Sequence, residues 1–337
     1  MKILVIGGTS FIGPAVVRRL LNDGHDVTLF HRGQHESDDA ARVSHIHGDR
    51  ARIEEHAEAF RRLAPDVVLD MRAMTGRDAT LLLAAVSGAT SRIVAISSVD
   101  VYRAYGRMHG SEPGPPEPTP LHEDSPLRKQ LYPYRGERDD PAMDEYDKIP
   151  VEQAYLSDTA IAGTVLRLPA VHGERDYQHR LYLELARFDA ARPFVLVQEE
   201  AADWRWPRAY AANVADGIAL AVTDGRAAGR VYNVSEPDAL TQLEWVELVG
   251  RLAGWTGEIV LARGALLPRH LRLLDGPAQD MDVDSTRIRR ELGYRERVTR
   301  EDGVLRAIAW ERKHPPKQAD PAWTDFSLDD TVVANDA

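Results

Sequence analysis

The sequence of 337 residues contains no cysteine, and this absence excludes disulfide bonds and thiolate metal ligands. It fits the reducing cytoplasm, where we expect the protein to act. The chain opens directly into a short apolar run, without the basic, apolar and cleavage-site regions of a secretory signal. No apolar run approaches the roughly 18 residues that a membrane-spanning helix needs. We therefore predict neither secretion nor contact with a membrane.

Positive charge is also scarce, because 42 Lys and Arg residues face 53 Asp and Glu residues, for a net charge of −11. This balance argues against a general nucleic-acid-binding protein, which needs a cationic face. No Lys or Arg follows Lys317, whereas five aspartates do, so residues 316–337 are predicted to form a solvated, frayed acidic tail. None of the twelve histidines shows His-Glu-x-x-His or a similar spacing, so no metal site is predicted.

The first thirteen residues run an apolar strand, Ile3–Ile6, into a glycine turn and the start of a helix. Gly7 and Gly8 permit a tight turn, and Gly13 lets the following helix lie close to the sheet. The backbone N–H groups at the helix start then face a phosphate, as in dinucleotide-binding proteins. An amphipathic helix, a second strand and an Asp after a third strand follow in the expected order, at 14–23, 26–30 and 44–49. The order predicts a dinucleotide site.

Strand and helix signals alternate to about residue 170, which predicts an α/β fold with a doubly wound parallel sheet. Further predicted strands are 66–70, 92–97, 163–168, 194–198 and 230–234, and further predicted helices are 79–86, 177–189, 214–222, 243–252 and 284–292. We expect a dinucleotide-binding domain from residues 1–172 and 207–237, and a smaller substrate lobe from 173–206 and 238–315. Eight prolines and four glycines interrupt the pattern at 106–141, which favours a functional cover over the sheet edge rather than plain disorder.

Six segments, taken together, resemble the extended short-chain dehydrogenase/reductase superfamily, of the NAD-dependent epimerase/dehydratase kind. They are Gly7–Gly13, Ser97–Tyr102, Lys148–Glu152, Leu166–Gly173, Val231–Ser235 and Glu291–Tyr294. Their order along the chain is that of the family, and the resemblance extends to about residue 313. Ser10 stands where the extended family has a glycine. With the Phe30–Gly33 run, this is more similar to an atypical branch that includes sugar dehydratases, reductases and chloroplast proteins described as RNA-binding.

The cofactor expectations combine the resemblance with the residues themselves. NAD-binding proteins of this fold usually place an acid at the end of the second strand, for the ribose 2′-hydroxyl. That place falls on His31, and the neighbouring Arg32 can pair with a 2′-phosphate. We therefore favour NADP, with NAD as the alternative. The full set of predicted cofactor-binding residues is Gly7, Thr9, Ser10, Phe11, Ile12, Gly13, His31, Arg32, Asp49, Arg50, Asp70, Met71, Arg72, Ser97, Lys148 and Leu168.

At the reacting end, the resemblance implies a Ser, a Tyr and a Lys beside the nicotinamide. The Lys holds the ribose and lowers the pKa of the Tyr, which serves as acid/base, while the Ser orients the substrate. Ser98 and Lys148 match the family positions, but the family's tyrosine position, four residues before the lysine, is Asp144. Tyr146 is two residues away, where a helix would point it to nearly the opposite face.

Tyr146 can share the site with Lys148 only if the helix begins at about Asp147, and Pro141 makes such a late start plausible. We predict Ser98, Tyr146 and Lys148 as the catalytic residues. Two alternatives stay open from the sequence. Another tyrosine (Tyr102, Tyr132 or Tyr134) enters the pocket, or the site has no competent acid/base and binds cofactor without turnover.

Cations and indoles of the second lobe suit a nucleotide-sugar diphosphate and its stacked base. The predicted substrate-binding residues are Tyr102, Arg175, His179, Arg180 and Trp204, whereas His172 is read as packing. We predict an NAD(P)-dependent epimerase, dehydratase or reductase of a sugar or nucleotide sugar. The alternative is a cofactor-bound regulatory or RNA-associating protein of the same fold. The resemblance also implies a homodimer, on which the residues themselves are silent.

Overall fold

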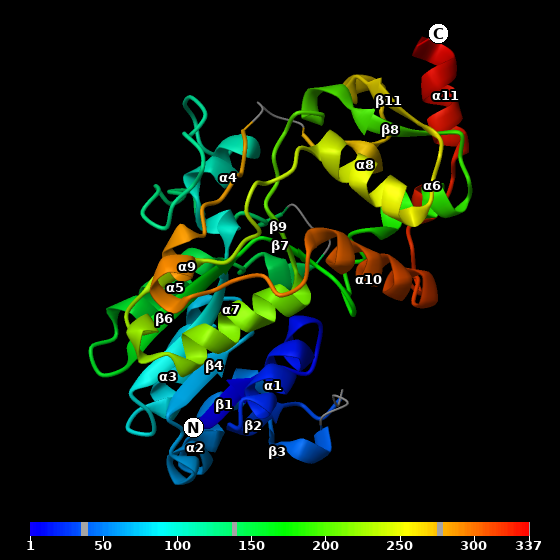
Figure 1. Cartoon of the computed structure of the whole chain (residues 1–337). Coiled ribbons are helices and arrows are strands. Elements are labelled where there is room, and N and C mark those ends of the chain that lie inside the picture. The colour runs from blue at the N-terminus through cyan, green and yellow to red at the C-terminus, as the bar shows by residue number, and fades with distance from the viewer. Residues whose placement is uncertain (35–39, 137–139, 275–278, 337) are drawn as a thin grey trace.

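The centre of the molecule is a seven-stranded parallel sheet with strand order β10-β6-β5-β4-β1-β2-β3 (Figure 1). The structure, a computed structural model, describes residues 1–34, 40–136, 140–274 and 279–336. The strands are β1 (Lys2–Ile6), β2 (Asp26–His31), β3 (Ser44–His47), β4 (Val67–Asp70), β5 (Arg92–Ser98), β6 (Ala162–Leu168) and β10 (Val231–Asn233). This arrangement confirms the predicted doubly wound sheet. Its carboxyl edge is where ligands bind in such folds.

Helices cover both faces of the sheet. One face carries α1 (Ile12–Asn22) and α7 (Ala211–Thr223), and the other carries α2 (Ala57–Leu63), α3 (Gly76–Val86) and α5 (Lys148–Ser157). The buried neighbours Leu4 and Val5 belong to opposite core clusters, because successive strand side chains point to opposite faces. Burial on both sides explains why central strands such as β1 and β4 read as continuous apolar runs.

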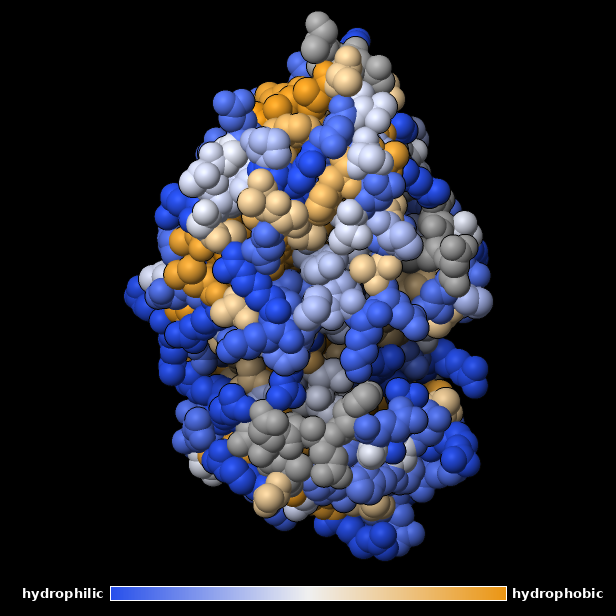
Figure 2. Space-filling view, turned by 90° about the vertical axis from the view of Figure 1, so that its right-hand side faces the viewer, coloured by the Kyte–Doolittle hydropathy of each residue, from blue (hydrophilic) through white to orange (hydrophobic). Residues whose placement is uncertain are grey.

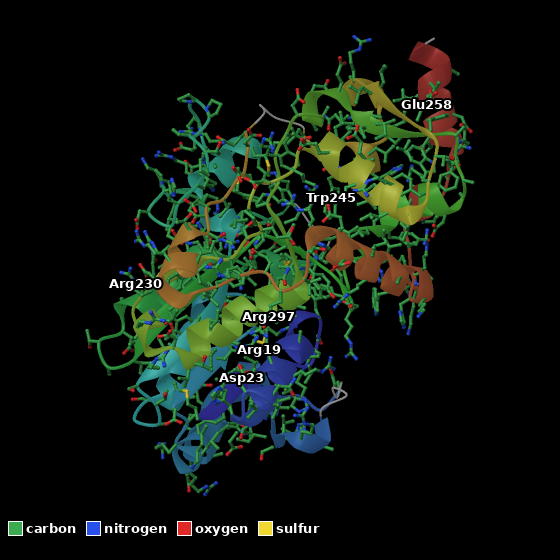
Figure 3. The ribbon with its side chains drawn as sticks, in the orientation of Figure 1. Arg19, Asp23, Arg230, Trp245, Glu258 and Arg297 are labelled. Atoms are coloured by element: carbon green, nitrogen blue, oxygen red, sulfur yellow. The ribbon has the colours of Figure 1, made fainter. Side chains whose placement is uncertain are left out.

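The helices α1 and α7 are also joined by charged side chains. Asp216 on α7 pairs with Arg19 on α1 and, at 3.3 Å, with Arg297, which lies just before the helix that begins at Arg300. Arg19 and Arg297 are labelled in Figure 3. Arg19 makes a second ion pair within its own helix, at 2.8 Å from Asp23. These groups are partly exposed, so each pair is expected to contribute at most about 1 kcal/mol.

A second, smaller lobe lies above the sheet in Figure 1. It contains the parallel pair β8 (Phe194–Gln198) and β11 (Glu258–Ala262), with α6 (Tyr182–Asp189), α8 (Gln242–Ala253) and α10 (Arg300–Lys313). A short parallel pair, β7 (Ala170–His172) and β9 (Arg208–Tyr210), lies outside the main sheet. The remaining helices are α4 (Arg103–Met108), α9 (Thr286–Leu292), α11 (Ser327–Asp336) and 3₁₀ turns at Ala40–Arg42, Arg50–His56, Val99–Val101, Pro141–Met143, Glu199–Ala201, Gly225–Ala227, Gly264–Leu266, Arg269–Leu271 and Pro321–Trp323.

The helix predicted at 177–189 begins only at Tyr182, and this part of the prediction was wrong. Arg175 and His179 have φ angles of 67° and 51°. These left-handed conformations interrupt a helix, because L-residues continue one only at negative φ. The residues before α6 instead form a turn-rich loop at the carboxyl edge of the sheet.

The described residues of segment 106–141 are held by specific hydrogen bonds; residues 137–139 lie outside the described part of the chain. The Glu112 carboxylate accepts from the backbone N–H groups of Lys129 and Gln130, at 2.5 and 2.7 Å. The buried Arg128 donates to the backbone oxygen of Asp100 and to the Asp147 carboxylate, at 2.5 and 3.0 Å. The segment is thus fixed against the end of β5, which fits a cover and excludes plain disorder of these residues.

The carboxyl-terminal segment is not a frayed tail, so that prediction was wrong. Residues 327–336 form α11, and Asp329 is completely buried against Arg187 of α6. Val332 is also buried and packs in an apolar cluster with Leu196 and Leu267. The tail is ordered because it meets complementary cations and apolar surface on the second lobe, which its own composition does not reveal.

The surface differs between the two lobes. Figure 2 shows hydrophobic side chains gathered on the upper part of one face, whereas the lower part is largely hydrophilic. Large exposed hydrophobic residues of the second lobe include Leu261, Leu266 and Leu328. Within the described ranges, every helix is too short or too polar to cross a membrane.

Candidate functional site

The glycine turn after β1 has the predicted geometry. Gly7 and Gly8 have φ angles of 92° and 87°, which glycine adopts readily. A Cβ atom on Gly13 would lie 2.5 Å from the carbonyl carbon of Gly8, so a side chain cannot fit there. Met71 and Arg72 follow β4 beside this turn, since a Cβ on Gly7 would lie 3.8 Å from the Cβ of each. The turn, with Thr9 on its partly exposed surface, has room for backbone contact with a phosphate.

The residue at the family's central glycine position is accommodated without strain. Ser10 is exposed, and its carbonyl accepts a hydrogen bond from Gly13 at 2.9 Å, which starts α1. The unusual backbone falls on Phe11 instead, with a φ of 48°. Phe11 is the N-cap of α1, and a phenyl ring has no oxygen with which to cap N–H groups. The amides of the first helical turn, from Ile12 onward, thus suit an anion.

The loop before α6 covers this turn. The ring of Tyr177 meets Phe11 edge-on at 6.1 Å, and the Arg180 guanidinium lies 5.9 Å from the Phe11 ring centre. Arg180 is held by Asp176 at 2.7 Å, and the half-buried Arg175 belongs to the same loop. The prediction placed Arg180 near substrate, but the structure places it above the glycine turn. Tyr177, which is exposed, had no motif to reveal it.

His179 does not face this loop's interior, contrary to its predicted role in substrate binding. Its Nδ1 atom lies 2.5 Å from the Glu311 carboxylate, and its ring stacks on Trp310 with a centroid distance of 5.8 Å. Both partners belong to α10. His179 therefore links the loop to the second lobe through these contacts with α10.

At the end of β2, the structure separates two predicted cofactor residues. His31 is buried, and its ring is turned toward β3, where Nε2 lies 2.7 Å from Nδ1 of His45. This geometry therefore does not favour the predicted contact between His31 and a cofactor ribose. Arg32, in contrast, is exposed at the carboxyl edge, where a 2′-phosphate would lie.

The predicted ligands Asp70 and Arg50 bind each other instead. Asp70 is completely buried and accepts from both terminal nitrogens of Arg50 at 2.6 Å, from the Tyr155 hydroxyl at 2.5 Å and from the backbone of Arg72 at 3.0 Å. Burial raises the pKa of Asp70, but the charge and hydrogen bonds of Arg50 outweigh it, and the pKa falls below its usual value. This pair is a structural support for the edge. Asp49 is exposed and caps the turn that follows it.

The buried network between β5, β6 and α5 takes up another predicted residue. The Ser97 hydroxyl donates to Glu152 at 2.6 Å, and Glu152 accepts from Arg167 at 3.0 and 2.7 Å. All three side chains are buried, so the predicted cofactor contact of the Ser97 side chain is not supported. Leu168 is likewise packed in the apolar core at the end of β6. The network fixes α5 relative to the strands.

Four polar side chains meet at the end of β5. The helix α5 begins at Lys148, with Asp147 as its N-cap, so Tyr146 lies before the helix as the shared site required. The Tyr146 hydroxyl donates to Asp100 at 2.8 Å, and Ser98 interacts with both residues. Lys148 donates to the backbone oxygens of Ala73 and Ile96, at 2.5 and 3.1 Å, and its Nζ lies 5.6 Å from the Tyr146 ring centre.

The electrostatics of this cluster differ from the expectation that Lys148 lowers the pKa of Tyr146. Burial, followed by the charge of Asp100, raises the pKa of Tyr146 well above its usual value. Burial also raises the pKa of Asp100, and it lowers the pKa of Lys148. The reason is that Asp100, which sequence reasoning missed, accepts directly from the phenol, whereas the Lys148 ammonium donates to two backbone oxygens. Its place between Ser98 and Tyr102 in a recognised motif was the signal.

Of the alternative tyrosines, Tyr134 joins the cluster and Tyr102 does not. The Tyr134 hydroxyl lies 3.4 Å from the Asp100 carboxylate, and its ring centre lies 5.3 Å from that of Tyr146. Tyr102 is fully buried, and its hydroxyl donates to Asn233 at 2.5 Å, so this geometry does not favour its predicted role in substrate binding. Tyr132 lies outside the cluster, with its ring under the Arg135 guanidinium.

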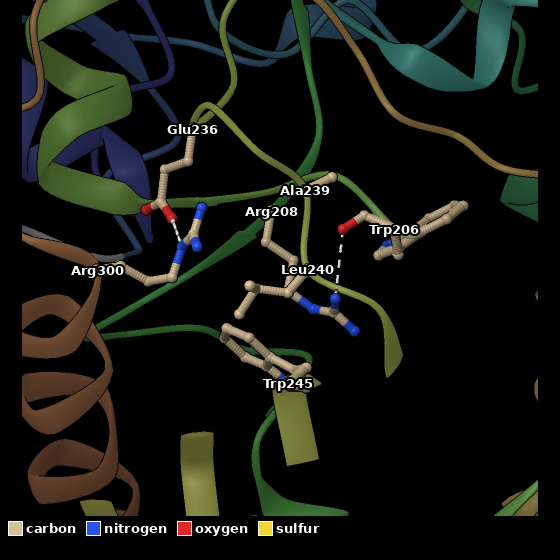
Figure 4. A pocket seen from close by; sticks show the side chains of 7 residues that line it. All are labelled: Trp206, Arg208, Glu236, Ala239, Leu240, Trp245 and Arg300. Carbon is tan, nitrogen blue, oxygen red and sulfur yellow. Dashed lines mark hydrogen bonds and ion pairs between the residues drawn. The ribbon is translucent and has the colours of Figure 1, made fainter. Parts of the chain in front are cut away.

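A pocket lies between β9, α8 and α10, lined by Trp206, Arg208, Glu236, Ala239, Leu240, Trp245 and Arg300 (Figure 4). The guanidinium of Arg208 lies 4.4 Å from the Trp245 ring centre and donates to Gln242 at 2.7 Å. Burial lowers the pKa of Arg208 to about 10. The sequence analysis chose Trp204 of this aromatic-basic segment as the substrate-binding residue, whereas Trp206 lines the pocket. Trp204 is buried, and its indole N–H donates to a backbone oxygen of the second lobe.

His172 lies beside this pocket and packs between aromatic rings, in the packing role that the sequence analysis gave it. It is buried between the rings of Tyr210 and Trp245, at centroid distances of 6.0 and 5.3 Å. Burial lowers its pKa to about 3, so the imidazole is uncharged. Among the described residues, neither ring nitrogen has a hydrogen-bond partner.

Comparison with known proteins extends these observations. Residues 3–135 match the model of the NAD dependent epimerase/dehydratase family. The chain is 23% identical to a dTDP-glucose 4,6-dehydratase of Shigella flexneri, over 92% of each chain. It resembles the structure of UDP-glucose 4-epimerase from Thermotoga maritima with UDP-glucose (TM-score 0.69, 19% identity, 93% of this chain and 99% of that one). It also resembles a dTDP-glucose 4,6-dehydratase of Bacillus anthracis in complex with NAD (TM-score 0.69, 17%, 93% and 97%). The predicted resemblance and fold are confirmed.

Proposed function

We propose that the chain, whose residues 3–135 match the model of the NAD dependent epimerase/dehydratase family, is an NAD(P)-dependent enzyme of sugar or nucleotide-sugar chemistry. This proposal is based on one cluster of side chains at the carboxyl edge of the sheet, the edge that also carries the glycine turn. The cluster contains Ser98, Asp100, Tyr146 and Lys148. A carboxylate, a phenol and an ammonium, all buried together, are the groups that acid/base chemistry on a hydroxyl requires.

The glycine turn fits a dinucleotide. At Gly13 any Cβ atom would collide with Gly8, so only glycine allows this close approach of the helix to the turn. The first amides of α1, after Phe11, have no side-chain cap and suit an anion. We propose that these amides hold the pyrophosphate and that the backbone of 71–73 lies beside the adenosine half. A bound nicotinamide would accept a hydride from the substrate carbon. The related dehydratase of Bacillus anthracis binds NAD, whereas the exposed Arg32 favours NADP here.

Replacing Arg32 with Ala is expected to weaken NADP binding about tenfold or more while leaving NAD binding unchanged. The reason is that charge-assisted hydrogen bonds to a phosphate are each worth about 1.5–3 kcal/mol. Fluorescence titration with both reduced cofactors measures the two affinities. Arg61→Ala, at an exposed arginine of α2, is the matched control. Equal losses for NAD and NADP, or no loss, would show that Arg32 does not select the phosphate.

We propose that proton transfer runs through Tyr146 to Asp100. The raised pKa of Tyr146 keeps its hydroxyl protonated, and that proton already points at the Asp100 carboxylate at 2.8 Å. When the substrate hydroxyl gives its proton to the Tyr146 oxygen, Tyr146 passes its own proton to Asp100. The substrate carbon then becomes a carbonyl carbon as its hydride leaves. Ser98 orients the hydroxyl, and the Lys148 ammonium stabilises the negative charge around the ring.

The substrate proposal rests on the pocket of the second lobe. Arg208 and Arg300 bring two guanidinium groups to a pocket with two indoles, Trp206 and Trp245. Cations suit a diphosphate, and indoles suit a stacked base. The related epimerase of Thermotoga maritima binds UDP-glucose. We propose that a diphosphate group binds at this pocket, which is too small to hold a whole nucleotide, and that the attached sugar is directed toward Tyr146.

The test is an assay of the purified protein with NAD or NADP and a panel of nucleoside diphosphate hexoses. We expect reduced nicotinamide, or a changed sugar identified by NMR, with at least one member of the panel. Cofactor binding without any turnover, together with RNA binding that persists at physiological salt, would instead support the regulatory or RNA-associating alternative. No cofactor binding at all would overturn the proposal.

A further inference from the structure

His31, His45 and His47 gather on β2 and β3, the two strands at one edge of the main sheet. Figure 1 shows the place of these two strands. His31 is the last residue of β2, and its register partner across the parallel ladder is His47, the last residue of β3. His45 lies two residues before His47 and therefore points to the same face. The strand pairing thus brings three imidazoles together that no helical motif in the sequence could reveal.

The distances within this cluster are short. The ring centre of His31 lies 5.0 Å from that of His45 and 4.9 Å from that of His47, and the His45 and His47 rings are stacked at 5.8 Å. One nitrogen from each ring can be chosen so that all three lie within 4.8 Å of one another. Ligand nitrogens around a tetrahedral zinc ion, with bonds of about 2.0–2.1 Å, are about 3.3 Å apart. Binding of an ion therefore requires side-chain rotations that change these separations by up to about 1.5 Å.

We propose that His31, His45 and His47 form a binding site for a divalent transition-metal ion of the zinc class. Three neutral imidazoles with a fourth position open to water are an established donor set for Zn²⁺. Exposure increases from the buried His31 through the half-buried His45 to the exposed His47, so an ion reaches the site from solvent. β3 is the outer strand of the sheet, which leaves this approach open at its edge.

A hydrogen bond between two imidazoles accounts for only part of this arrangement. His31 and His45 share one at 2.7 Å, but His47 adds a third ring at the register position opposite His31. The Nδ1 atom of His31 accepts from the Gly33 N–H at 3.2 Å. When Nε2 binds a metal, the remaining proton is on Nδ1, and this amide must turn away. Gly33, with a φ of 75°, has the backbone freedom to do so.

The site is separate from the proposed chemistry. Ser98 and Tyr146 belong to the other side of β1 in the strand order, next to β5 and α5, so the metal site does not require the proposed function to be correct. Residues that follow β2, including Arg32, lie next to the site. A bound ion would therefore add positive charge near the edge at which we expect the cofactor's adenosine half.

The test uses tag-free protein, treated with chelator and then titrated with Zn²⁺ alone, by calorimetry. One ion per chain is expected for the wild type. His47→Gln, at the exposed position, is expected to weaken Zn²⁺ binding about tenfold or more, and His45→Gln likewise. Each variant replaces the imidazole with the polar amide of glutamine on an edge strand, a change that we expect the fold to tolerate. Circular dichroism checks that both variants are folded. His314→Gln, at an exposed histidine of the carboxyl-terminal region, is the matched control.

Co²⁺ gives a second readout, since a tetrahedral site produces strong visible absorption bands and an octahedral aqueous ion does not. The bands are expected in the wild type and in the His314 variant, and are expected to be lost in the His47 variant. Unchanged Zn²⁺ affinity in both the His45 and His47 variants, or no binding to the wild type, overturns the proposal. Should His47→Gln fail to fold, the His45 variant and the Co²⁺ spectrum of the wild type decide the question in the same way.

Discussion

Replacing Tyr146 with Phe is expected to lower kcat about 10²- to 10⁴-fold, the usual contribution of a positioned acid/base. The substitution removes one oxygen from a buried ring and leaves the packing against Tyr134 intact. That oxygen lies 2.8 Å from Asp100, and without it a substrate proton has no path to the carboxylate. Turnover with an accepted nucleotide sugar measures the effect, and cofactor affinity is expected to stay constant.

The proton path also predicts a pH dependence. Asp100 must be ionised to receive the proton, and burial raises its pKa above the usual value of 3.8. The rate is therefore expected to fall as pH decreases through that raised pKa and to be steady above it, until other groups titrate. Asp100→Asn keeps the shape but cannot take the proton. It is expected to lower kcat and to abolish the acidic limb of the profile, which a merely structural effect would leave in place.

Tyr134→Phe is the matched control for this pair, because Tyr134 is a second phenol beside Asp100 at the longer distance of 3.4 Å. We expect it to change kcat by less than about tenfold, since the direct donor remains. An undiminished rate in Tyr146→Phe, with a large loss in Tyr134→Phe, would assign the chemistry to Tyr134. Full activity in both variants would remove the phenols from the mechanism.

Most of the sheet could be predicted from the sequence because its central strands are apolar runs placed between turn signals. Such a pattern is local, and Val67–Asp70 or Arg92–Ser98 reads as a buried strand without its neighbours. The glycine turn is predictable for the same reason, since Gly7, Gly8 and Gly13 are required by backbone geometry that follows directly from β1. The sequence showed that α5 must begin at about Asp147 if Tyr146 is to share the site with Lys148. It could not show that the helix begins there, because an earlier start was also compatible with the sequence.

The side-chain partners could not be predicted, because they depend on distances between elements far apart in sequence. Asp70 and Arg50 carry the charges of ligands, but the fold places them together and buries them. Tyr102 belongs to a family motif, yet its hydroxyl donates a hydrogen bond to Asn233, at the end of another strand of the sheet. The same limitation hid Asp100 and Arg208, whose importance comes from what lies beside them. It also hid the histidine cluster, which exists only because β2 and β3 pair in one register.

The second large effect concerns stability. Replacing Asp329 with Asn is expected to lower the free energy of unfolding by about 3–5 kcal/mol, the usual cost of leaving a buried charge without its partner. Asp329 is fully buried, and its carboxylate accepts from Arg187 at 2.7 and 3.0 Å. Arg187 is itself almost completely buried, so its guanidinium cannot find water in the variant. Urea denaturation followed by tryptophan fluorescence measures the change.

The neighbouring residue supplies the control. Asp330 also pairs with an arginine, Arg192, but its side chain is 55% exposed, so Asp330→Asn is expected to cost at most about 1 kcal/mol. Replacing Arg187 and Asp329 together with Met and Leu is expected to recover much of the loss, because the desolvation cost of both charges disappears. Equal, small losses in Asp329→Asn and Asp330→Asn would mean that the terminal helix is detached in solution. The difference between these adjacent aspartates therefore tests whether acidic residues at this terminus serve as a structural anchor or as a solvated tail.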